Sequence, residues 1–419
     1  MSDASHLFSA YDRGLMSRRQ LLQALGIAAV ATPFAGSFSR AFAQGGCAGR
    51  PADTTAACGK AQMKAPFAPT GWKTTLLDHF SMKVTDAEKE AAFYAAFVGW
   101  KVRSNDANGI YMDIGDWGGV MIKGGYTPPP PGARGGRGGG GAGAGAGAGG
   151  GAGGGRAGGG AGGGGGGAPA NPSNMAACAT PKIDLSIPGA GALWDGFCWG
   201  ITPWDTKKVE AALKERGLNP VADHDGKDFY SFHVKDPDGL DVQISNGTKK
   251  NRRQGPANGK LNAPLPFEPL GLKSMYLDHI SFQCTSYKET VAFYTALLGW
   301  KGLGDEGSQN ETEISKEIGG LLIRGGNATS PTFVMPAERR AVMNHISFGV
   351  SPWDSDKIWE AMCKRGLTGR VDTGAIATSA EKETDIHTAT YKSYHTRTPN
   401  NYDLQFSSKI SADQSTGPQ

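Results

Sequence analysis

The chain has 419 residues, of which 64 are glycine, and it carries 43 basic against 39 acidic side chains. This length suits two or three domains. A formal net charge of +4 gives no electrostatic reason to expect nucleic acid or an anionic membrane surface as a partner.

The N-terminus carries the features of an export signal. Two adjacent arginines in SRRQLLQ at 17–23 precede a moderately apolar run, and AFA at 41–43 is a small-x-small cleavage site. The apolar run is too short to cross a bilayer of ~30 Å hydrocarbon. We therefore expect a twin-arginine signal peptide over 1–43, with the twin-arginine translocase as partner during export. The mature protein would begin near Gln44, without a stable membrane anchor, and would be periplasmic or secreted.

Six cysteines in an exported chain permit disulfides. Cys47 and Cys58, in the N-terminal segment 44–72, enclose a short loop that a disulfide could close. Cys198, Cys284 and Cys363 lie in periodic segments, where we expect buried free thiols.

Glycine is concentrated in one tract. Between Gly132 and Gly167, 25 of 36 positions are glycine, directly after four prolines at 128–131. Such a stretch has almost no apolar surface to offset the entropy of ordering it, so we expect a disordered insertion over 127–170. Its GxGxxG matches do not lie between a strand and a helix, so they indicate no nucleotide site.

Outside this tract the chain is a duplication. Residues 77–101 match 277–301 without a gap at 12 of 25 positions. Residues 199–218 match 348–367 at 9 of 20 positions. We expect one domain over 73–247 and a second over 274–409, joined by a basic linker over 248–273 and followed by a tail over 410–419. We call these two domains copy one and copy two.

The first half of each copy contains one predicted helix between strands. An alternating strand at 77–84 or 277–284 leads into a helix that should end at Gly99 or Gly299, a natural left-handed cap. Short strand-like segments follow each helix.

The second half of each copy repeats this order. Its helix should be capped by Asp205 or Asp354 of the two PWD triplets, and its last strands should be joined by tight turns at 236–239 and 398–401. We interpret each half as a βαβββ unit, which makes the chain α+β.

These motifs resemble the vicinal-oxygen-chelate superfamily of glyoxalases, bleomycin-resistance proteins and type I extradiol dioxygenases. The resemblance rests on the duplicated βαβββ unit, the strands LDHIS and NHISF, and the final hairpin with its glutamine. It covers nearly all of 73–409 apart from the glycine tract and the linker. It implies two tandem glyoxalase-like domains, each of two paired βαβββ modules that form a concave half-barrel sheet with the ligand or metal on its inner face.

The resemblance also implies a metal site in copy two. His279, His345 and Gln405 fall on the polar faces of three alternating strands, and the family places its metal ligands at those strand positions. Extradiol dioxygenases use two histidines and a glutamate there to hold Fe(II). The amide of Gln405 can still ligate through its oxygen, but the missing charge should weaken the binding of Fe²⁺, Mn²⁺ or Zn²⁺. A metal-free polar pocket is the alternative.

Copy one lacks one of these three residues. His79 and Gln243 match His279 and Gln405, but Gly196 stands at the place of His345. Two ligands do not hold a metal firmly, so we expect copy one to be a structural or binding partner.

Three neighbours in copy two are catalytic candidates. His395 and the adjacent Tyr394 lie near the place where the dioxygenases keep a tyrosine or histidine beside the substrate, and His387 lies close to another histidine position of that family. A histidine could shuttle protons near neutrality. The alternative is a structural role, because His233 occupies the place of His395 in copy one.

Two functional hypotheses follow. The first is an exported mononuclear metal enzyme, most like an extradiol ring-cleaving dioxygenase, with a glyoxalase-like isomerase or lyase as a variant. The second is a metal-free protein of the bleomycin-resistance type that binds a small, flat or aromatic molecule. A homo-oligomer is compatible with both.

Overall fold

The computed structural model describes residues 63–127, 192–225, 228–305, 307, 309–330, 333–339, 341–367, 369–373 and 385–412. In copy one the elements are β1 Lys73–Val84, α5 Ala87–Val98, β2 Lys101–Asp106, β3 Gly109–Ile114, β4 Gly118–Lys123, β5 Ala192–Thr202, α6 Thr206–Glu215, β6 Val221–Asp225, β7 Phe229–Lys235 and β8 Asp241–Ser245. In copy two they are β9 Lys273–Ser286, α7 Tyr287–Leu298, β10 Lys301–Asp305, β11 Gln309–Ser315, β12 Gly319–Gly326, β13 Val342–Ser351, α8 Ser355–Lys364, β14 Arg370–Asp372, β15 Ser393–Arg397 and β16 Asp403–Ser407.

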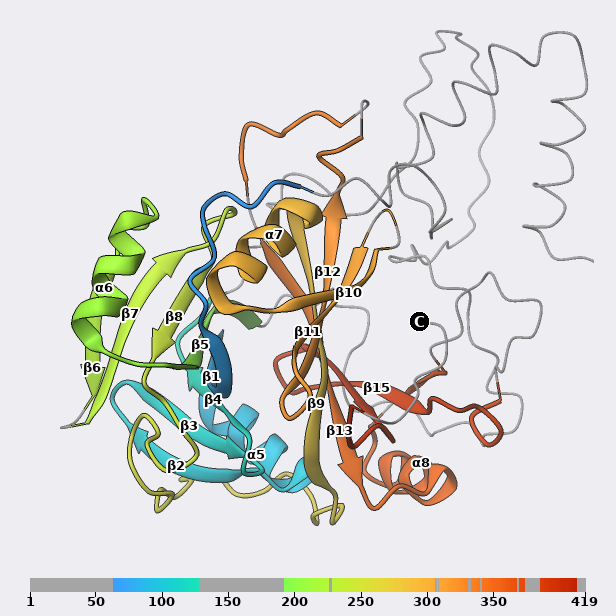
Figure 1. The fold of residues 1–419 in the computed structure, drawn as a ribbon. Helices are drawn as coiled ribbons and strands as arrows, with labels where there is room; N and C mark the ends of the chain where they lie inside the picture. The colour runs from blue at the N-terminus through green and yellow to red at the C-terminus, as the bar shows by residue number, and fades with distance from the viewer. Residues whose placement is uncertain are drawn as a thin grey trace, which may run out of the picture.

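Each copy forms one continuous eight-stranded sheet (Figure 1). The strand order is β2-β3-β4-β1-β5-β8-β7-β6 in copy one and β10-β11-β12-β9-β13-β16-β15-β14 in copy two. Within each sheet, the first strands of the two βαβββ modules pair antiparallel, β1 with β5 and β9 with β13. The predicted α+β fold of two tandem domains, each built from two paired βαβββ modules, is confirmed.

The helix ends lie where the sequence predicts them. Gly99 and Gly299 follow α5 and α7 with φ of 69° and 72°, the left-handed conformation that glycine adopts at little cost. Asp205 and Asp354 cap α6 and α8, and each side chain accepts a hydrogen bond from the backbone N–H three residues later.

The first strand of each copy departs from strict alternation. The pairing of β1 with β5 skips Asp78, and the pairing of β9 with β13 skips Asp278. Such a bulge adds one residue to one strand and changes where the neighbouring side chains point. Asp78 and Asp278, which precede His79 and His279, are buried, and Asp278 is hydrogen-bonded to polar side chains rather than packed among aliphatic ones.

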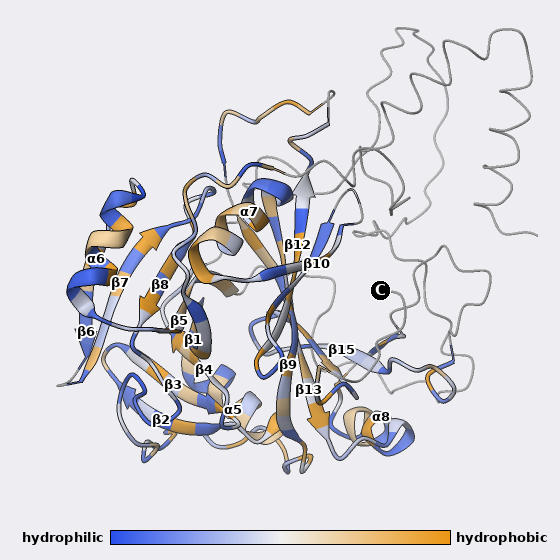
Figure 2. Ribbon diagram, in the orientation of Figure 1, coloured by the Kyte–Doolittle hydropathy of each residue, from blue (hydrophilic) through white to orange (hydrophobic). Residues whose placement is uncertain are grey.

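The two copies share one hydrophobic core. Hydrophobic segments, coloured orange in Figure 2, occur in the strands and helices of both copies. The contacts between the copies are reciprocal, because Trp100 packs on Phe348 with ring centroids 5.0 Å apart and Trp300 packs on Trp199 at 5.1 Å. Trp100 and Trp300 are buried, so they belong to the core as aromatic packing residues.

The final turn of each copy contacts the start of the first helix of the other. Asn400 Oδ1 accepts hydrogen bonds from the backbone N–H groups of Thr85 and Asp86, just before α5. In the same way, Asp238 Oδ2 accepts from the N–H of Thr285, just before α7. The two tight turns predicted from the sequence thus bind the segments that lead into these helices, across the interface between the copies.

Several sequence predictions lie outside the described residues: the signal peptide 1–43, the Cys47–Cys58 loop and the glycine tract. Of the described cysteines, Cys198 and Cys284 are buried free thiols, as predicted. Cys363 is disulfide-bonded, so its prediction as a free thiol was wrong. Periodicity marks a buried helix face but carries no information about a partner elsewhere in the chain.

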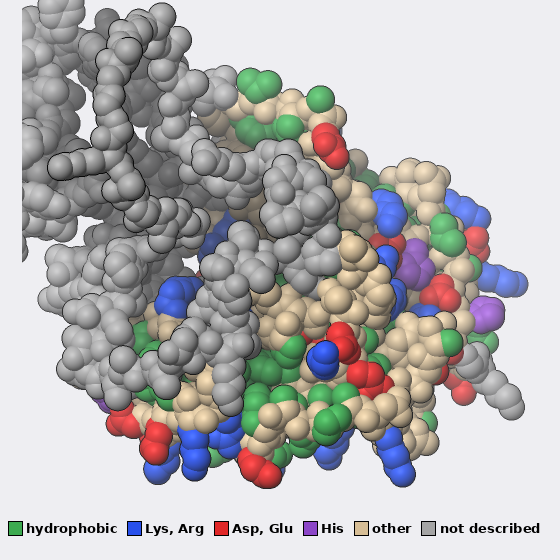
Figure 3. Space-filling model, turned by 180° about the vertical axis from the view of Figure 1, so that it is seen from behind, with side chains coloured by type: hydrophobic (Ala, Val, Ile, Leu, Met, Phe, Trp, Pro, Cys, Tyr) green, Lys and Arg blue, Asp and Glu red, His purple; other side chains and the backbone are tan. Residues whose placement is uncertain are grey.

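In the part of the chain that the structure describes, no helix has the length and apolarity needed to span a bilayer. The described surface in Figure 3 carries acidic and basic side chains interspersed with one another. This mixture agrees with the small net charge of the sequence.

Candidate functional site

The polar face of the copy-two sheet brings His279 and His345 together. His279 lies on β9 and His345 on the neighbouring β13, and their Nε2 atoms are 3.1 Å apart. Burial, followed by the nearby His279 and His395, holds the pKa of His345 well below its ordinary value of 6.5. His345 is therefore neutral near pH 7, with one ring nitrogen able to accept a hydrogen bond or bind a metal.

Gln405 lies on β16, the next strand after β13, and is buried. Its amide nitrogen donates to Ser393 Oγ at 2.8 Å and to Tyr391 Oη at 3.2 Å. The side-chain oxygen makes no hydrogen bond with the described residues, so it is available to a ligand. The three predicted ligand residues thus lie on three adjacent strands, β9, β13 and β16.

Asp278, which precedes His279 on β9, is buried and hydrogen-bonded through its carboxylate. Its Oδ2 atom accepts three hydrogen bonds, from the hydroxyls of Tyr391 at 2.6 Å, Ser407 at 2.8 Å and Ser347 at 2.9 Å. Burial opposes ionisation, but the nearby His279, Lys409 and Tyr391 hold the pKa of Asp278 well below its ordinary value.

The other oxygen of this carboxylate faces His279. Asp278 Oδ1 lies 3.6 Å from His279 Nδ1, and neither atom has a hydrogen-bond partner in the described chain. A small ring rotation would let the Nδ1–H donate to this oxygen, which would leave the Nε2 lone pair of His279 free for a ligand.

His395 lies beside His345, but its contacts do not suit the predicted role of a proton shuttle. Its ring lies 5.4 Å from that of His345, and its two nitrogens contact Asp403 and Asp372, each at 3.2 Å. Burial lowers its pKa, but the two carboxylates outweigh this effect and raise it. His395 is thus favoured as a cation with both nitrogens engaged, and it is poorly suited to act as a general base.

Copy one repeats this arrangement, which favours the structural alternative for His395. His233 contacts Asp241 at 2.6 Å and Asp223 at 3.3 Å. These three residues occupy the register positions of His395, Asp403 and Asp372.

Two further catalytic candidates lie away from the ligand group. Tyr394 is fully buried in the core, where it stacks on Trp353 and its hydroxyl donates to the Ser355 carbonyl of α8. It was predicted beside the substrate, but strand alternation turns it to the face opposite His395. His387 lies at the surface, where its ring nitrogens contact Asp385 at 2.8 Å and Asp356 of α8 at 2.9 Å. These contacts give both residues structural roles.

Copy one holds a different buried group. Ligand atoms of Asp78, His79 and Cys198 lie within 4.8 Å of one another, a spacing that could suit a metal. A cation is already present, because Arg252 of the linker donates from Nε to Asp78 Oδ1 at 3.1 Å. Burial opposes ionisation, but His79 and Arg252 lower the pKa of Asp78 to about 2. Burial also raises the pKa of the Cys198 thiol strongly, which disfavours the thiolate that a metal needs.

The register of the sheets confirms that Gly196 is the counterpart of His345. Gly196 pairs with Ser81 across β5 and β1, as His345 pairs with Ser281 across β13 and β9. Gly196 has φ of +157°, and a Cβ atom there would lie 2.8 Å from the Asp241 carbonyl oxygen. A histidine at 196 would give copy one the same three residues as copy two, but the backbone excludes an unstrained side chain at this position.

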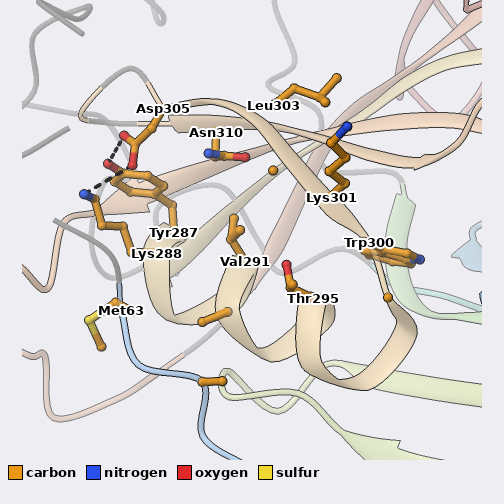
Figure 4. Close-up of a pocket in the computed structure, with 14 residues that line it drawn as sticks. Met63, Tyr287, Lys288, Val291, Thr295, Trp300, Lys301, Leu303, Asp305 and Asn310 are labelled. Carbon is orange, nitrogen blue, oxygen red and sulfur yellow. Dashed lines mark hydrogen bonds and ion pairs between the residues drawn. The ribbon is translucent and has the colours of Figure 1, made fainter. Parts of the chain in front are cut away.

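A larger cavity, of about 630 Å³, lies between α7 and the strands β10 and β11 (Figure 4). None of the predicted site residues lines it. Asp305 is engaged, because Tyr287 Oη donates to its Oδ1 at 2.6 Å and Lys288 Nζ lies 3.2 Å from its Oδ2, and Lys301 is the other charged lining residue. This cavity therefore offers less free acid–base chemistry than the concave face of copy two.

Sequence reasoning missed Asp278 and Tyr391. The repeated Leu-Asp-His triplet was a signal for Asp278, because a carboxylate beside each predicted ligand histidine is unusual within an alternating strand. Strict alternation assigned that position to the aliphatic face. Tyr391 precedes β15 in an irregular segment, where no periodic pattern indicates which way a side chain points.

Comparison with models of protein families finds no match. None of the curated proteins matches the chain either. Among solved structures, the chain is similar to a Mn(II)-bound glyoxalase from Novosphingobium aromaticivorans, with 15% identity, 82% of this chain and 85% of that chain covered, and a TM-score of 0.45. It is also similar to the 2,3-dioxygenase LapB from Pseudomonas sp. KL28, with 14% identity, 80% and 92% coverage, and a TM-score of 0.46. A third is homoprotocatechuate 2,3-dioxygenase from Brevibacterium fuscum with bound 3,4-dihydroxyphenylacetate, at 16% identity, 85% and 87% coverage, and a TM-score of 0.45.

Proposed function

We propose that copy two binds one divalent metal ion through His279, His345 and Gln405, and that the protein is an exported metal enzyme acting on a small molecule. The observation that carries this proposal is the approach of the two Nε2 atoms to 3.1 Å. Two imidazoles bound to one ion at ~2.0–2.1 Å would hold their nitrogens about 2.8–3.4 Å apart at angles from 90° to 109°.

The surrounding residues fit a metal ion. The low pKa of His345 keeps a lone pair available, and the free oxygen of Gln405 supplies a neutral third donor. The buried Nδ1 atom of His279 faces Asp278, which is the usual arrangement of a carboxylate behind a metal-bound histidine. Two nitrogens and one amide oxygen carry no negative charge, so the site should bind less tightly than two histidines and a carboxylate.

The motif resemblance favours the reaction of an extradiol ring-cleaving dioxygenase. A bound Fe(II) or Mn(II) ion would supply Lewis-acid and redox chemistry at this position. The chain itself places His395 5.4 Å from the ring of His345, between the carboxylates of Asp403 and Asp372, whose charges offset that of an imidazolium.

Metal binding tests this proposal directly. The exported protein would be stripped with a chelator and titrated calorimetrically with Mn(II), Zn(II) and, without oxygen, Fe(II). We expect one ion per chain, loss of binding in His345→Ala, and at least about tenfold tighter binding in Gln405→Glu, which restores the missing charge. The matched control is His79→Ala, which removes the equivalent histidine of copy one and should leave this binding unchanged.

A metal-free binding protein is the second candidate function. A distance of 3.1 Å is also that of a hydrogen bond between two neutral imidazoles, so these groups can satisfy one another without an ion. If the wild-type protein takes up no metal, or if His345→Ala keeps the wild-type stoichiometry, the proposal of a metal enzyme is wrong and the metal-free binding protein takes its place. Ring cleavage of a catechol by the metal-loaded wild type would distinguish a dioxygenase from a glyoxalase-like enzyme.

We also propose that the protein is exported through the twin-arginine pathway. The disulfide at Cys363 supports this proposal, since disulfides persist in oxidising compartments. Terminal sequencing of the exported protein should find Gln44 or a close neighbour at its start. Export that survives replacement of both Arg18 and Arg19 by lysine would contradict the proposal.

A further inference from the structure

The concave face of copy one contains a cavity that the proposed metal site does not use. It has a volume of about 190 Å³, and His79, Ser81, Met121 and Gly196 are among its lining residues. At the corresponding place in copy two, the imidazole of His345 contacts His279. The glycine at 196 leaves that space open in copy one.

The cavity presents a neutral histidine. His79 Nδ1 lies 2.9 Å from a carboxylate oxygen of Asp78, to which it donates. Burial lowers the pKa of His79, Asp78 opposes this effect, and the charges of Arg253 and Lys123 lower the pKa further. With its proton on Nδ1, His79 offers the lone pair of Nε2, an atom that makes no hydrogen bond to the described residues.

Two further polar atoms of the cavity wall lack hydrogen-bond partners in the described chain. One is the hydroxyl of Ser81, which is 6% exposed. The other is Oδ1 of Asp195, whose second carboxylate oxygen pairs with Lys123. An unpaired buried polar group costs about 1–3 kcal/mol, so a ligand that donates hydrogen bonds to these oxygens and to His79 Nε2 would recover part of that energy.

The charges in the wall leave no excess of either sign. Each cation is paired with a carboxylate of the same wall. The pairs are Lys123 with Asp195 at 3.2 Å, Arg253 with Asp223 at 2.7 Å, and His233 with Asp241 at 2.6 Å. A charged ligand would have to break one of these pairs, so the cavity favours a neutral ligand.

Size limits the ligand further. An apolar cavity of ~150 Å³ holds one benzene molecule, so 190 Å³ accommodates about one ring with one or two small substituents. Met121 offers an apolar, polarisable contact on this face, since it pairs with Ser81 across β4 and β1. We propose that the copy-one cavity is a binding site for a small neutral hydroxylated ring compound, whose hydroxyl donates to His79 Nε2.

Binding can be measured at the cavity itself. Full-length mature protein, labelled with ¹³C at the methionine methyl groups and kept in a metal chelator, would be titrated with phenol by NMR. The Met121 methyl signal, assigned with Met121→Leu, should shift and saturate. The signal of Met275, which is 47% exposed in copy two, should not follow the same curve. Toluene, which has no hydroxyl, and benzoate, which is charged, should bind about tenfold more weakly or worse.

Two variants complete the test. His79→Ala should weaken phenol binding at least about tenfold, while His224→Ala, which removes an exposed histidine of the same copy, should leave it unchanged. If His79→Ala does not fold, the comparison of phenol with toluene and benzoate on wild-type protein still decides. A Met121 signal that does not respond to phenol, or that responds equally to toluene, would overturn the proposal and leave a cavity filled by water. Because chelator is present throughout, neither result depends on the metal site of copy two.

Discussion

Asp236 should make the stability of the protein depend on pH between about 4 and 6. It lies in the turn between β7 and β8 of copy one and is 5% exposed. Its Oδ1 atom accepts from the N–H groups of Asp238 and Leu240, and its Oδ2 atom accepts from the hydroxyl of Tyr294 on α7, at 3.0 Å. Burial outweighs these hydrogen bonds and, with the neighbouring charge of Asp238, raises the pKa of Asp236 from 3.8 to about 6.

The sign of the effect follows from proton binding. Because the folded pKa is higher than the unfolded one, the folded state holds this proton more tightly. The contribution of this proton to the stability of the folded state is therefore complete below about pH 4, and it is lost as the pH rises to about 6 and above. Two pKa values that differ by about two correspond to about 3 kcal/mol of unfolding free energy.

Asp236→Asn isolates this contribution, because the amide mimics the protonated acid in shape and hydrogen bonding. Urea unfolding followed by tryptophan fluorescence would be measured for both proteins from pH 4 to 7.5. Relative to wild type, the variant should be about 3 kcal/mol more stable at pH 7.5 than at pH 4. Asp116→Asn, at an exposed carboxylate, is the control and should run parallel to wild type. A constant difference between Asp236→Asn and wild type across this range would refute the reasoning.

Three other substitutions test the packing that holds the site. Thr74→Val removes the acceptor of the buried Trp300 Nε1–H across the interface and should cost about 1–3 kcal/mol in urea unfolding; an unchanged midpoint would contradict this contact. Gly196→Ala should cost about 1–3 kcal/mol, because of its positive φ and the close Asp241 carbonyl, and wild-type stability would show that the strand relaxes freely. Arg252→Met leaves the carboxylate of Asp78 buried without its cation and should lower the free energy of unfolding by about 3–5 kcal/mol at pH 7. A urea midpoint equal to that of wild type would contradict this expectation.

The sequence predicts the fold well because the fold repeats a local pattern. Period-two alternation places His279 and His345 on one side of their strands. The aliphatic residues that alternate with polar residues along each strand lie on the other side. The same alternation, applied to β15, turns Tyr394 away from His395, so its burial could have been anticipated from the sequence. Asp278 could not be placed this way, because a bulge shifts the register at that one residue.

Contacts between distant parts of the chain were beyond such reasoning. Arg252, in the linker, contacts Asp78 across 174 residues, and nothing in the linker composition indicates that it enters copy one. The disulfide of Cys363 and the hydrogen bonds that Asn400 and Asp238 make to the other copy are of the same kind. Each depends on how two separate segments meet, which local periodicity does not encode.

The exchange of contacts between the copies has a consequence for the origin of the chain. Trp100 donates to Ser274 and Trp300 donates to Thr74, each at 2.8 Å, so residue i of one copy meets residue j of the other and the reverse also holds. This reciprocity defines the isologous interface of a twofold symmetric dimer. The duplication thus has the geometry of a fused homodimer, and fusion leaves each half free to carry its own residue at an equivalent position, such as the glycine at 196 and the histidine at 345.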